Sequence, residues 1–125
     1  MGKKAVIVGA SSGIGYEVTR LLLEGGWTVG IAARRKEKLG SIQMVAPDRV
    51  FIEVIDVTVE EAPEKLHHLI RSMGGMDLYF HASGIGSLNP ELKNASIEMD
   101  TVRTNGLGWI QMVGEAYRYF SEQGY

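Results

Sequence analysis

Four short apolar runs alternate along this chain with longer stretches whose apolar residues recur at helical spacing. The runs cover residues 5–8, 28–33, 50–57 and 77–82, and we expect each to be a strand. The intervening stretches 13–24, 35–44 and 60–73, and a long one over 96–123, predict helices. Strands that are rich in consecutive apolar residues and separated by helices are typical of a parallel sheet covered on both faces. We therefore predict a single α/β domain over residues 1–125, a Rossmann-type doubly wound parallel sheet with strand order 3-2-1-4.

The same periodicity predicts which side chains of each helix face the sheet. In the first helix these are Ile14, Val18, Leu21 and Leu22. In the third they are Leu66, Leu69 and Ile70. The apolar positions of the last helix are Val102, Leu107, Ile110, Val113, Ala116, Tyr117 and Phe120.

A glycine-rich segment follows the first strand directly and leads into the first helix. It reads Gly9-Ala10-Ser11-Ser12-Gly13-Ile14-Gly15. A helix N-terminus offers unpaired N–H groups and the positive end of a dipole to an anion, and glycines let the backbone approach a phosphate closely. We therefore predict a nucleotide pyrophosphate site. Its parts are a tight turn at Gly9, hydroxyl donors at Ser11 and Ser12, backbone contacts at Gly13 and Ile14, and helix packing at Gly15. The alternative is a simple strand-to-helix turn.

Several motifs together resemble the short-chain dehydrogenase/reductase family. The spacing Gly-x-x-x-Gly-x-Gly after the first strand is similar to its glycine motif, and Asp56-Val57 resembles its adenine-contacting Asp-Val pair. His81-Ala82-Ser83-Gly84 stands where the family usually has Asn-Asn-Ala-Gly. Asn105 matches the Asn of the family's Asn-Leu-x-Gly helix segment, except that Gly106 precedes the leucine. The resemblance covers all 125 residues, which correspond to the first half of a typical member.

The resemblance implies roles for individual residues. Asp56 would accept a hydrogen bond from the adenine amino group, and Ala82, Ser83 and Gly84 would lie near the cofactor. Asn105 is the one catalytic-type residue, because the family uses this Asn to hold a water in a proton relay. The alternatives are a loop cap for Asp56 and an ordinary polar helix residue for Asn105. For His81 we favour a packed residue at the strand end over an acid/base group, and for Asp77 a strand-entry cap.

The end of the second strand indicates the cofactor. A carboxylate there would bind the adenosine ribose and select NAD, but this chain has Ala33 followed by Arg34 and Arg35. A guanidinium can pair with a 2′-phosphate through two hydrogen bonds and can stack on adenine. We therefore predict NADP(H), with Arg34 as the main partner and Arg35 or Ser11 assisting. The alternative is a solvated run of charges over residues 34–38.

The catalytic residues of the family's second half are absent from this sequence. The resemblance implies a Ser and a Tyr-x-x-x-Lys beyond the long helix, and no Tyr-x-x-x-Lys occurs here. We expect the cofactor-binding part of an NADP(H)-dependent carbonyl reductase or alcohol dehydrogenase, truncated before the fifth strand and inactive alone. The alternatives are a non-catalytic NADP(H)-binding or sensing module and a pure interaction domain. The glycine loop and Arg34 argue against the last of these.

The composition restricts the classes of partner that we expect the protein to bind. A net charge of −2 gives no basic field for nucleic acid, and no apolar run approaches the ~20 residues of a membrane span. The absence of cysteine fits a reducing cytoplasm, and the adjacent His67 and His68 cannot share a helix face to bind a metal. Without a fifth strand, the fourth would be an open edge and part of Trp109, Ile110 or Val113 would be uncovered. We therefore expect a homo-oligomer.

Overall fold

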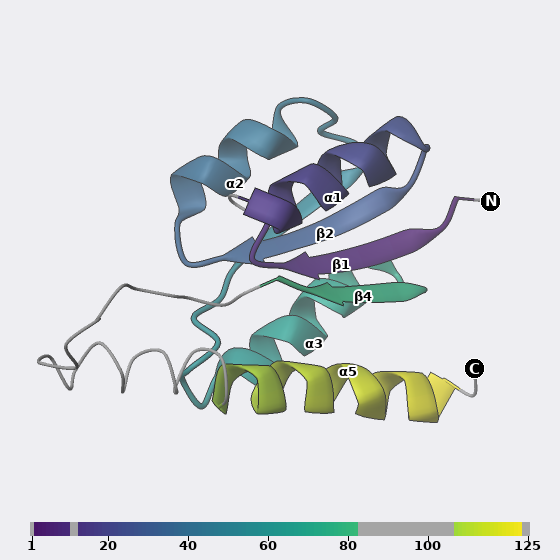
Figure 1. Ribbon diagram of the computed structural model, residues 1–125. Coiled ribbons are helices and arrows are strands. Elements are labelled where there is room, and N and C mark those ends of the chain that lie inside the picture. Colours follow the sequence, from purple (N-terminus) through teal and green to yellow (C-terminus); the bar gives the residue numbers. More distant parts are fainter. Residues whose placement is uncertain (1, 11–12, 83–106, 124–125) are drawn as a thin grey trace, which may run out of the picture.

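The computed structural model describes residues 2–10, 13–82 and 107–123, and these form a sheet between two helical layers (Figure 1). The strands are β1 (Lys4–Val8), β2 (Thr28–Ala33), β3 (Val50–Val54) and β4 (Leu78–His81). The helices are α1 (Gly13–Glu24), α2 (Lys36–Gln43), α3 (Ala62–Met73) and α5 (Trp109–Gln123). All strand pairs are parallel in the order β3-β2-β1-β4, which confirms the predicted topology.

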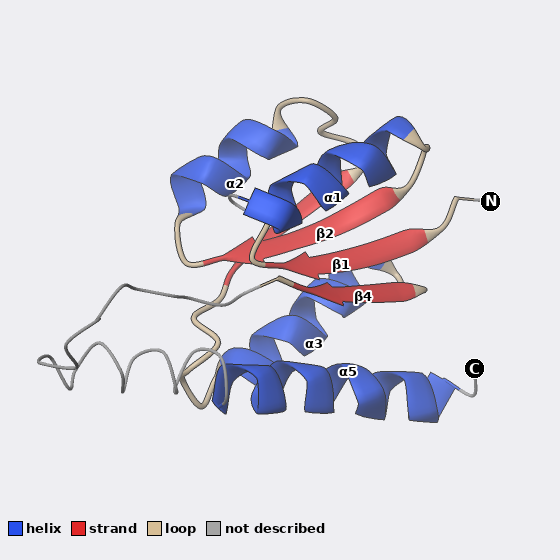
Figure 2. Ribbon diagram, in the orientation of Figure 1, coloured by secondary structure: helices blue, strands red, loops and turns tan. Residues whose placement is uncertain are grey.

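Each face of the sheet is covered by two helices (Figure 2). Under α1 and α2, the buried side chains include Ile7, Ile31 and Leu39. Under α3 and α5, they include Val6, Leu66 and Met112. Since successive strand residues point to opposite faces, β1 supplies both cores and is buried on both sides.

The prediction for the third strand is too long. The apolar run extends to Val57, but β3 ends at Val54 and residues 55–57 enter the loop before α3. The Ile55 N–H still donates to the Ala33 carbonyl at 3.0 Å. Ile55 and Val57 are buried without belonging to a strand, so their apolar character reflects packing of the loop rather than sheet pairing.

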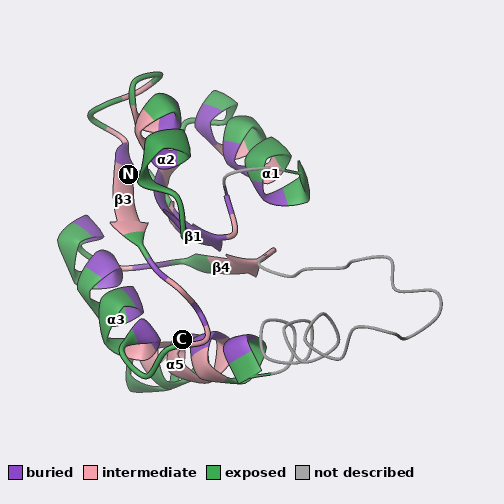
Figure 3. Ribbon diagram, turned by 90° about the vertical axis from the view of Figure 1, so that its left-hand side faces the viewer, coloured by how far each residue is buried: buried purple, intermediate pink, exposed green. Residues whose placement is uncertain are grey.

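The inward face of α1 is only partly the predicted one. Val18 and Leu22 pack against the core as predicted, but Ile14 and Leu21 are 72% and 58% exposed, and Gly15, Thr19 and Leu23 are buried. Buried and exposed positions therefore alternate along α1 (Figure 3). The reason is steric, because the helix meets the turn after β1 through its smallest residues. The stripe Gly15–Thr19–Leu23 follows a strict four-residue step, which a count of bulky apolar residues overlooks.

The α5 helix is less covered than its periodicity predicts. Met112 and Ala116 are buried, but Ile110 and Tyr117, both assigned to the apolar face, are exposed, as is Trp109. Within the described residues, β4 is also an edge strand, with β1 as its neighbour. The expected uncovered surface is thus present, and self-association stays a prediction. None of the described helices has the length and apolar character needed to cross a bilayer.

Asp77 lies at the entry to β4, as predicted. Its Oδ2 accepts the Lys4 N–H at 2.9 Å, while its own N–H donates to the Lys4 carbonyl at 2.7 Å. These two bonds fix the register of β4 against β1 from their first residues.

Two leucines of α1 test its observed orientation. Leu23→Ala removes a buried side chain and should lower the free energy of unfolding by about 2–5 kcal/mol. Leu21→Ala, on the exposed side of the same helix, should change it by about 0.5 kcal/mol or less. Urea unfolding measures both values. Equal losses would contradict the observed orientation.

Gly15 tests the contact between α1 and the turn. A Cβ at this position would lie 2.1 Å from the Gly9 carbonyl oxygen, so Gly15→Ala should cost at least about 1–3 kcal/mol. In the matched change Gly40→Ala in α2, the new methyl meets nothing within 4 Å and should stabilise the fold by about 0.5–1 kcal/mol. Thermal unfolding of the two variants should give shifts of opposite sign, and a neutral Gly15→Ala would disprove the close contact.

Candidate functional site

The candidate site lies at the edge of the sheet where the carboxyl ends of the strands meet. The Gly9 N–H donates to the Ala32 carbonyl at 2.7 Å, and the Ala82 N–H donates to the Val8 carbonyl at 2.8 Å. These bonds join the residues that follow β1 and β4 to the last residues of β2 and β1. The carboxyl ends of the four parallel strands meet at this edge (Figure 1). The strand bounds therefore assign Gly9, Ala33, Asp56 and Ala82 to it, from four separate parts of the sequence.

Two glycines at the turn adopt backbone conformations that favour glycine. Gly9 and Gly13 have φ angles of +88° and +63°, a region in which other residues are strained. Gly13 begins α1, so the unpaired N–H groups of the first helical turn lie next to the sheet edge. The first turn of α1 carries no acidic side chain that would repel an anion. The turn is therefore compatible with a phosphate group at this end of α1.

Two arginines follow the buried end of β2. Ala33 is buried, whereas Arg34 and Arg35 are exposed between β2 and α2. The Arg34 charge helps to lower the pKa of Asp56, although less than the hydrogen bonds from Thr58 do. This end of the sheet therefore carries an exposed cation after β2 and a carboxylate after β3.

Asp56 is held by the residue two positions later. Its Oδ1 accepts hydrogen bonds from the Thr58 N–H at 3.0 Å and from the Thr58 hydroxyl at 2.6 Å. The hydroxyl bond is the main cause that lowers the pKa of Asp56; the N–H bond and the Arg34 charge act the same way, while burial opposes them. Asp56 thus caps its own loop, as one interpretation of the sequence proposed. Both bonds use Oδ1, so an adenine contact is compatible with the cap and stays a prediction.

Gln111 is a residue that the sequence analysis did not identify. Its Nε2 donates to the Val57 carbonyl at 2.7 Å and to the Val59 carbonyl at 3.1 Å, in the loop that carries Asp56. The only available signal was one amide among the apolar residues at the start of α5. That signal is too weak to identify a partner more than 50 positions away.

His81 is part of a small cluster on β4. Its Nδ1 lies 2.9 Å from the Tyr79 hydroxyl, and the two rings are 6.0 Å apart. Burial raises the pKa of Tyr79, so this phenol stays protonated at neutral pH. The contact supports the packed interpretation of His81.

Five predicted site residues lie outside the described part of the chain. They are Ser11, Ser12, Ser83, Gly84 and Asn105. Their roles remain predictions.

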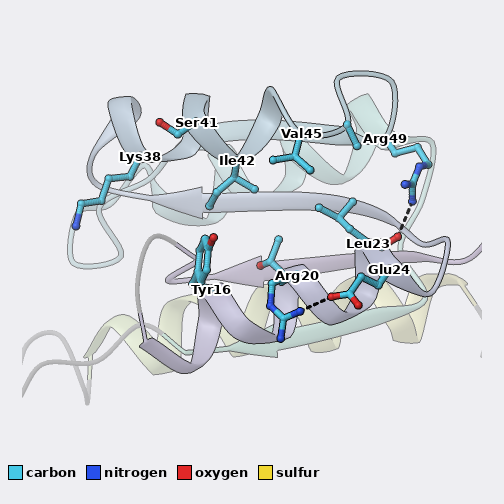
Figure 4. Close-up of a pocket in the computed structure, with 11 residues that line it drawn as sticks. Tyr16, Arg20, Leu23, Glu24, Lys38, Ser41, Ile42, Val45 and Arg49 are labelled. Atoms are coloured by element: carbon cyan, nitrogen blue, oxygen red, sulfur yellow. Dashed lines mark hydrogen bonds and ion pairs between the residues drawn. The ribbon is translucent and has the colours of Figure 1, made fainter.

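A cavity of about 520 Å³ lies between α1 and α2, away from the predicted cofactor residues (Figure 4). Leu23, Ile42 and Val45 line it, together with charged side chains. Two of these charges pair with groups that line the same cavity: Arg20 with Glu24, and Arg49 with the Leu23 carbonyl, to which it donates at 3.1 Å. None of the lining residues is a predicted cofactor residue, so size alone does not make this cavity the functional site.

The two adjacent histidines of α3 pair with different glutamates. His67 Nδ1 lies 3.7 Å from Glu115, and His68 Nδ1 lies 3.0 Å from Glu53. Among the residues that the structure describes, no group of three ligand side chains could hold a metal.

The Thr58 hydroxyl tests the electrostatics of the Asp56 loop. Thr58→Val removes the main cause of the lowered Asp56 pKa, so this pKa should rise toward the ordinary value of 3.8. A carboxyl whose pKa is lower in the folded state than in the unfolded state stabilises the fold at pH values above its unfolded-state pKa. This stabilisation disappears as the pH falls through the folded-state pKa. The variant should therefore lose less stability on acidification than the wild type. Carboxyl NMR titration measures the pKa, and an unchanged value would contradict the proposed cause.

Comparison with known proteins places this geometry in a family. The family model for short chain dehydrogenases matches residues 3–125. An uncharacterized oxidoreductase of Staphylococcus saprophyticus is 33% identical over 127 residues; the match covers 97% of this chain and 50% of that protein.

Solved structures show the same fold. A short-chain dehydrogenase from Streptomyces avermitilis has a TM-score of 0.88 at 24% identity, covering 99% of this chain and 46% of that one. The 3-ketoacyl-(acyl-carrier-protein) reductase of Brucella melitensis, solved with NADH, has a TM-score of 0.87 at 25% identity, covering 98% of this chain and 52% of that one. The present chain thus spans about half the length of these proteins. With its strand order, glycine turn and matching family model, the chain belongs to the short-chain dehydrogenase/reductase family.

Proposed function

We propose that this chain is the cofactor-binding part of an NADP(H)-dependent oxidoreductase that interconverts a carbonyl and an alcohol. The observation that carries the proposal is the end of β2, which is bonded to the glycine turn through Ala32, ends on the small buried Ala33 and is followed by the exposed Arg34. Family membership supports a nicotinamide cofactor. Membership of the family does not decide between NADP(H) and NAD(H), since the Brucella melitensis reductase of the same fold was solved with NADH. The choice of NADP(H) therefore rests on Arg34.

The glycine turn would hold the pyrophosphate. Positive φ angles at Gly9 and Gly13 give the turn its tight course, and the missing Cβ at Gly15 lets α1 start directly against it, so the unpaired N–H groups of the first turn of α1 would face the phosphates. Ser11 and Ser12 would add hydroxyl donors. The exposed side chain of Ile14 points away from the core, which leaves its backbone as the contacting group.

The two arginines would bind the adenosine phosphate. Ala33 leaves space where a carboxylate would repel a phosphate, and the exposed Arg34 can donate two parallel hydrogen bonds to it. Arg35, the next residue, would assist. The neighbouring Asp56 would accept from the adenine amino group while Arg34 stacks on or pairs beside the ring system.

The bound cofactor supplies the hydride, and the residues of this chain would orient it. Ala82 follows β4, next to the end of β1, and its small side chain would leave room beside the nicotinamide half. With Ser83 and Gly84 it would form the wall at that point. Asn105 would hold a water in the proton relay, the one catalytic role that we assign within this sequence.

A non-catalytic NADP(H)-binding or sensing module is the alternative, since the sequence contains no Tyr-x-x-x-Lys. The full-length protein distinguishes the two. Oxidation of NADPH in the presence of a panel of aldehydes and ketones supports the oxidoreductase. Tight NADPH binding without turnover of any carbonyl or alcohol supports the sensing module.

Arg34 gives the sharpest test of cofactor choice. The wild type should bind NADPH more tightly than NADH, and Arg34→Ala should weaken NADPH binding by about tenfold or more while leaving NADH binding unchanged. Fluorescence titration of the reduced nicotinamide measures both affinities. Lys38→Ala is the matched control, because it removes one charge from the same run at the α1–α2 cavity. Equal wild-type affinities for the two cofactors would refute the proposal.

A further inference from the structure

One side chain of α5 links two distant segments at the candidate site. Gln111 lies near the start of the helix, and its amide donates to two carbonyls of the loop between β3 and α3. The shorter bond, 2.7 Å to the Val57 carbonyl, is half-buried. The longer bond, 3.1 Å to the Val59 carbonyl, is exposed.

The loop depends on such contacts because it runs beyond the sheet. β3 ends at Val54, so residues 55–59 continue without a regular strand ladder. The Val59 carbonyl also accepts the Ala62 N–H at 3.1 Å, where α3 begins. The Gln111 amide therefore binds the loop at two places, in its middle at Val57 and closer to α3 at Val59.

Asp56 immediately precedes the segment that these bonds fix. Thr58 holds its Oδ1 directly. Gln111 holds the carbonyl of the next residue, Val57, which is only 4% exposed. The carboxylate is thus fixed by a direct contact within the loop, and the adjoining backbone by a contact from a separate helix.

We infer that Gln111 is a positioning residue that sets the Asp56 carboxylate for recognition of the adenine base. The inference rests on the proposed function, in which Asp56 accepts from the adenine amino group. Gln111 does not touch the base. Loss of its amide frees the Val57 carbonyl and lets the loop shift, and a hydrogen bond is sensitive to shifts of a few tenths of an ångström.

The test compares NADPH with its analogue that carries hypoxanthine in place of adenine. Hypoxanthine lacks the amino donor, so the wild type should prefer NADPH by about tenfold, and Asp56→Ala should abolish the preference. Gln111→Met keeps the length of the side chain without the amide. It should reduce the preference by about threefold or more, and Gln111→Glu, which cannot donate at neutral pH, should do the same.

Gln123→Met provides a matched control on the same helix. The Gln123 Nε2 also donates to a backbone carbonyl, that of Met76, at 3.5 Å, at the opposite end of α5. This variant should keep the full preference for adenine. Thermal unfolding of all variants confirms that each is folded, and if Gln111→Met does not fold, Gln111→Glu carries the test.

The outcomes separate the two proposals. If Asp56→Ala abolishes the preference but both Gln111 variants retain it, the positioning role is overturned while the adenine contact stands. The same holds if the Gln111 variants weaken both dinucleotides equally, since a merely structural effect does not distinguish the bases. If the wild type has no preference, or Asp56→Ala keeps it, the adenine contact fails and the role of Gln111 fails with it.

Discussion

The close approach of α1 to the turn after β1 is the constraint on which the site depends. At Gly15 the helix backbone lies so near the Gly9 carbonyl that a single methyl group would overlap it. This contact fixes where α1 begins, and therefore where its unpaired N–H groups lie relative to the sheet edge. The Thr19 hydroxyl extends the same stripe by donating to the Gly15 carbonyl at 2.8 Å. The position of the helix end that we propose for the pyrophosphate is thus set by packing within the protein.

The architecture could be predicted from sequence because apolar runs and glycines act locally. A run such as residues 29–33 lacks polar side chains because both faces of the strand are covered, so the parallel sheet and its order could be predicted. The inward face of α1 was predicted only in part, because Gly15 and Thr19 are small and a count of large apolar side chains shifts the face toward Leu21. The length of β3 was overestimated for a related reason. Ile55 and Val57 are apolar because a loop is buried, and periodicity cannot separate that case from a strand.

The same difference between local and long-range signals decides which residues of the candidate site could be predicted from sequence. Residues next to a strand end, such as Gly9, Ala33 and Ala82, were found because the topology brings strand ends together. Gln111 was missed because its bonds join segments more than 50 positions apart, and nothing local to either segment encodes the contact. For Asp56, the sequence offered a loop cap and an adenine contact as alternatives, whereas the geometry allows one carboxylate to serve both.

The central position of β1 has a consequence for the assembly of the sheet. β1 pairs with β2 on one side and with β4 on the other, so its second row of hydrogen bonds requires residues 78–81, far along the sequence. A chain in which only β1 to β3 have paired exposes one side of an apolar strand that can pair with the wrong partner. The long-range closure of β4 onto β1 also brings Ala82 beside Gly9. The pairing that protects the vulnerable side of β1 is therefore the same one that joins these two residues at the candidate site.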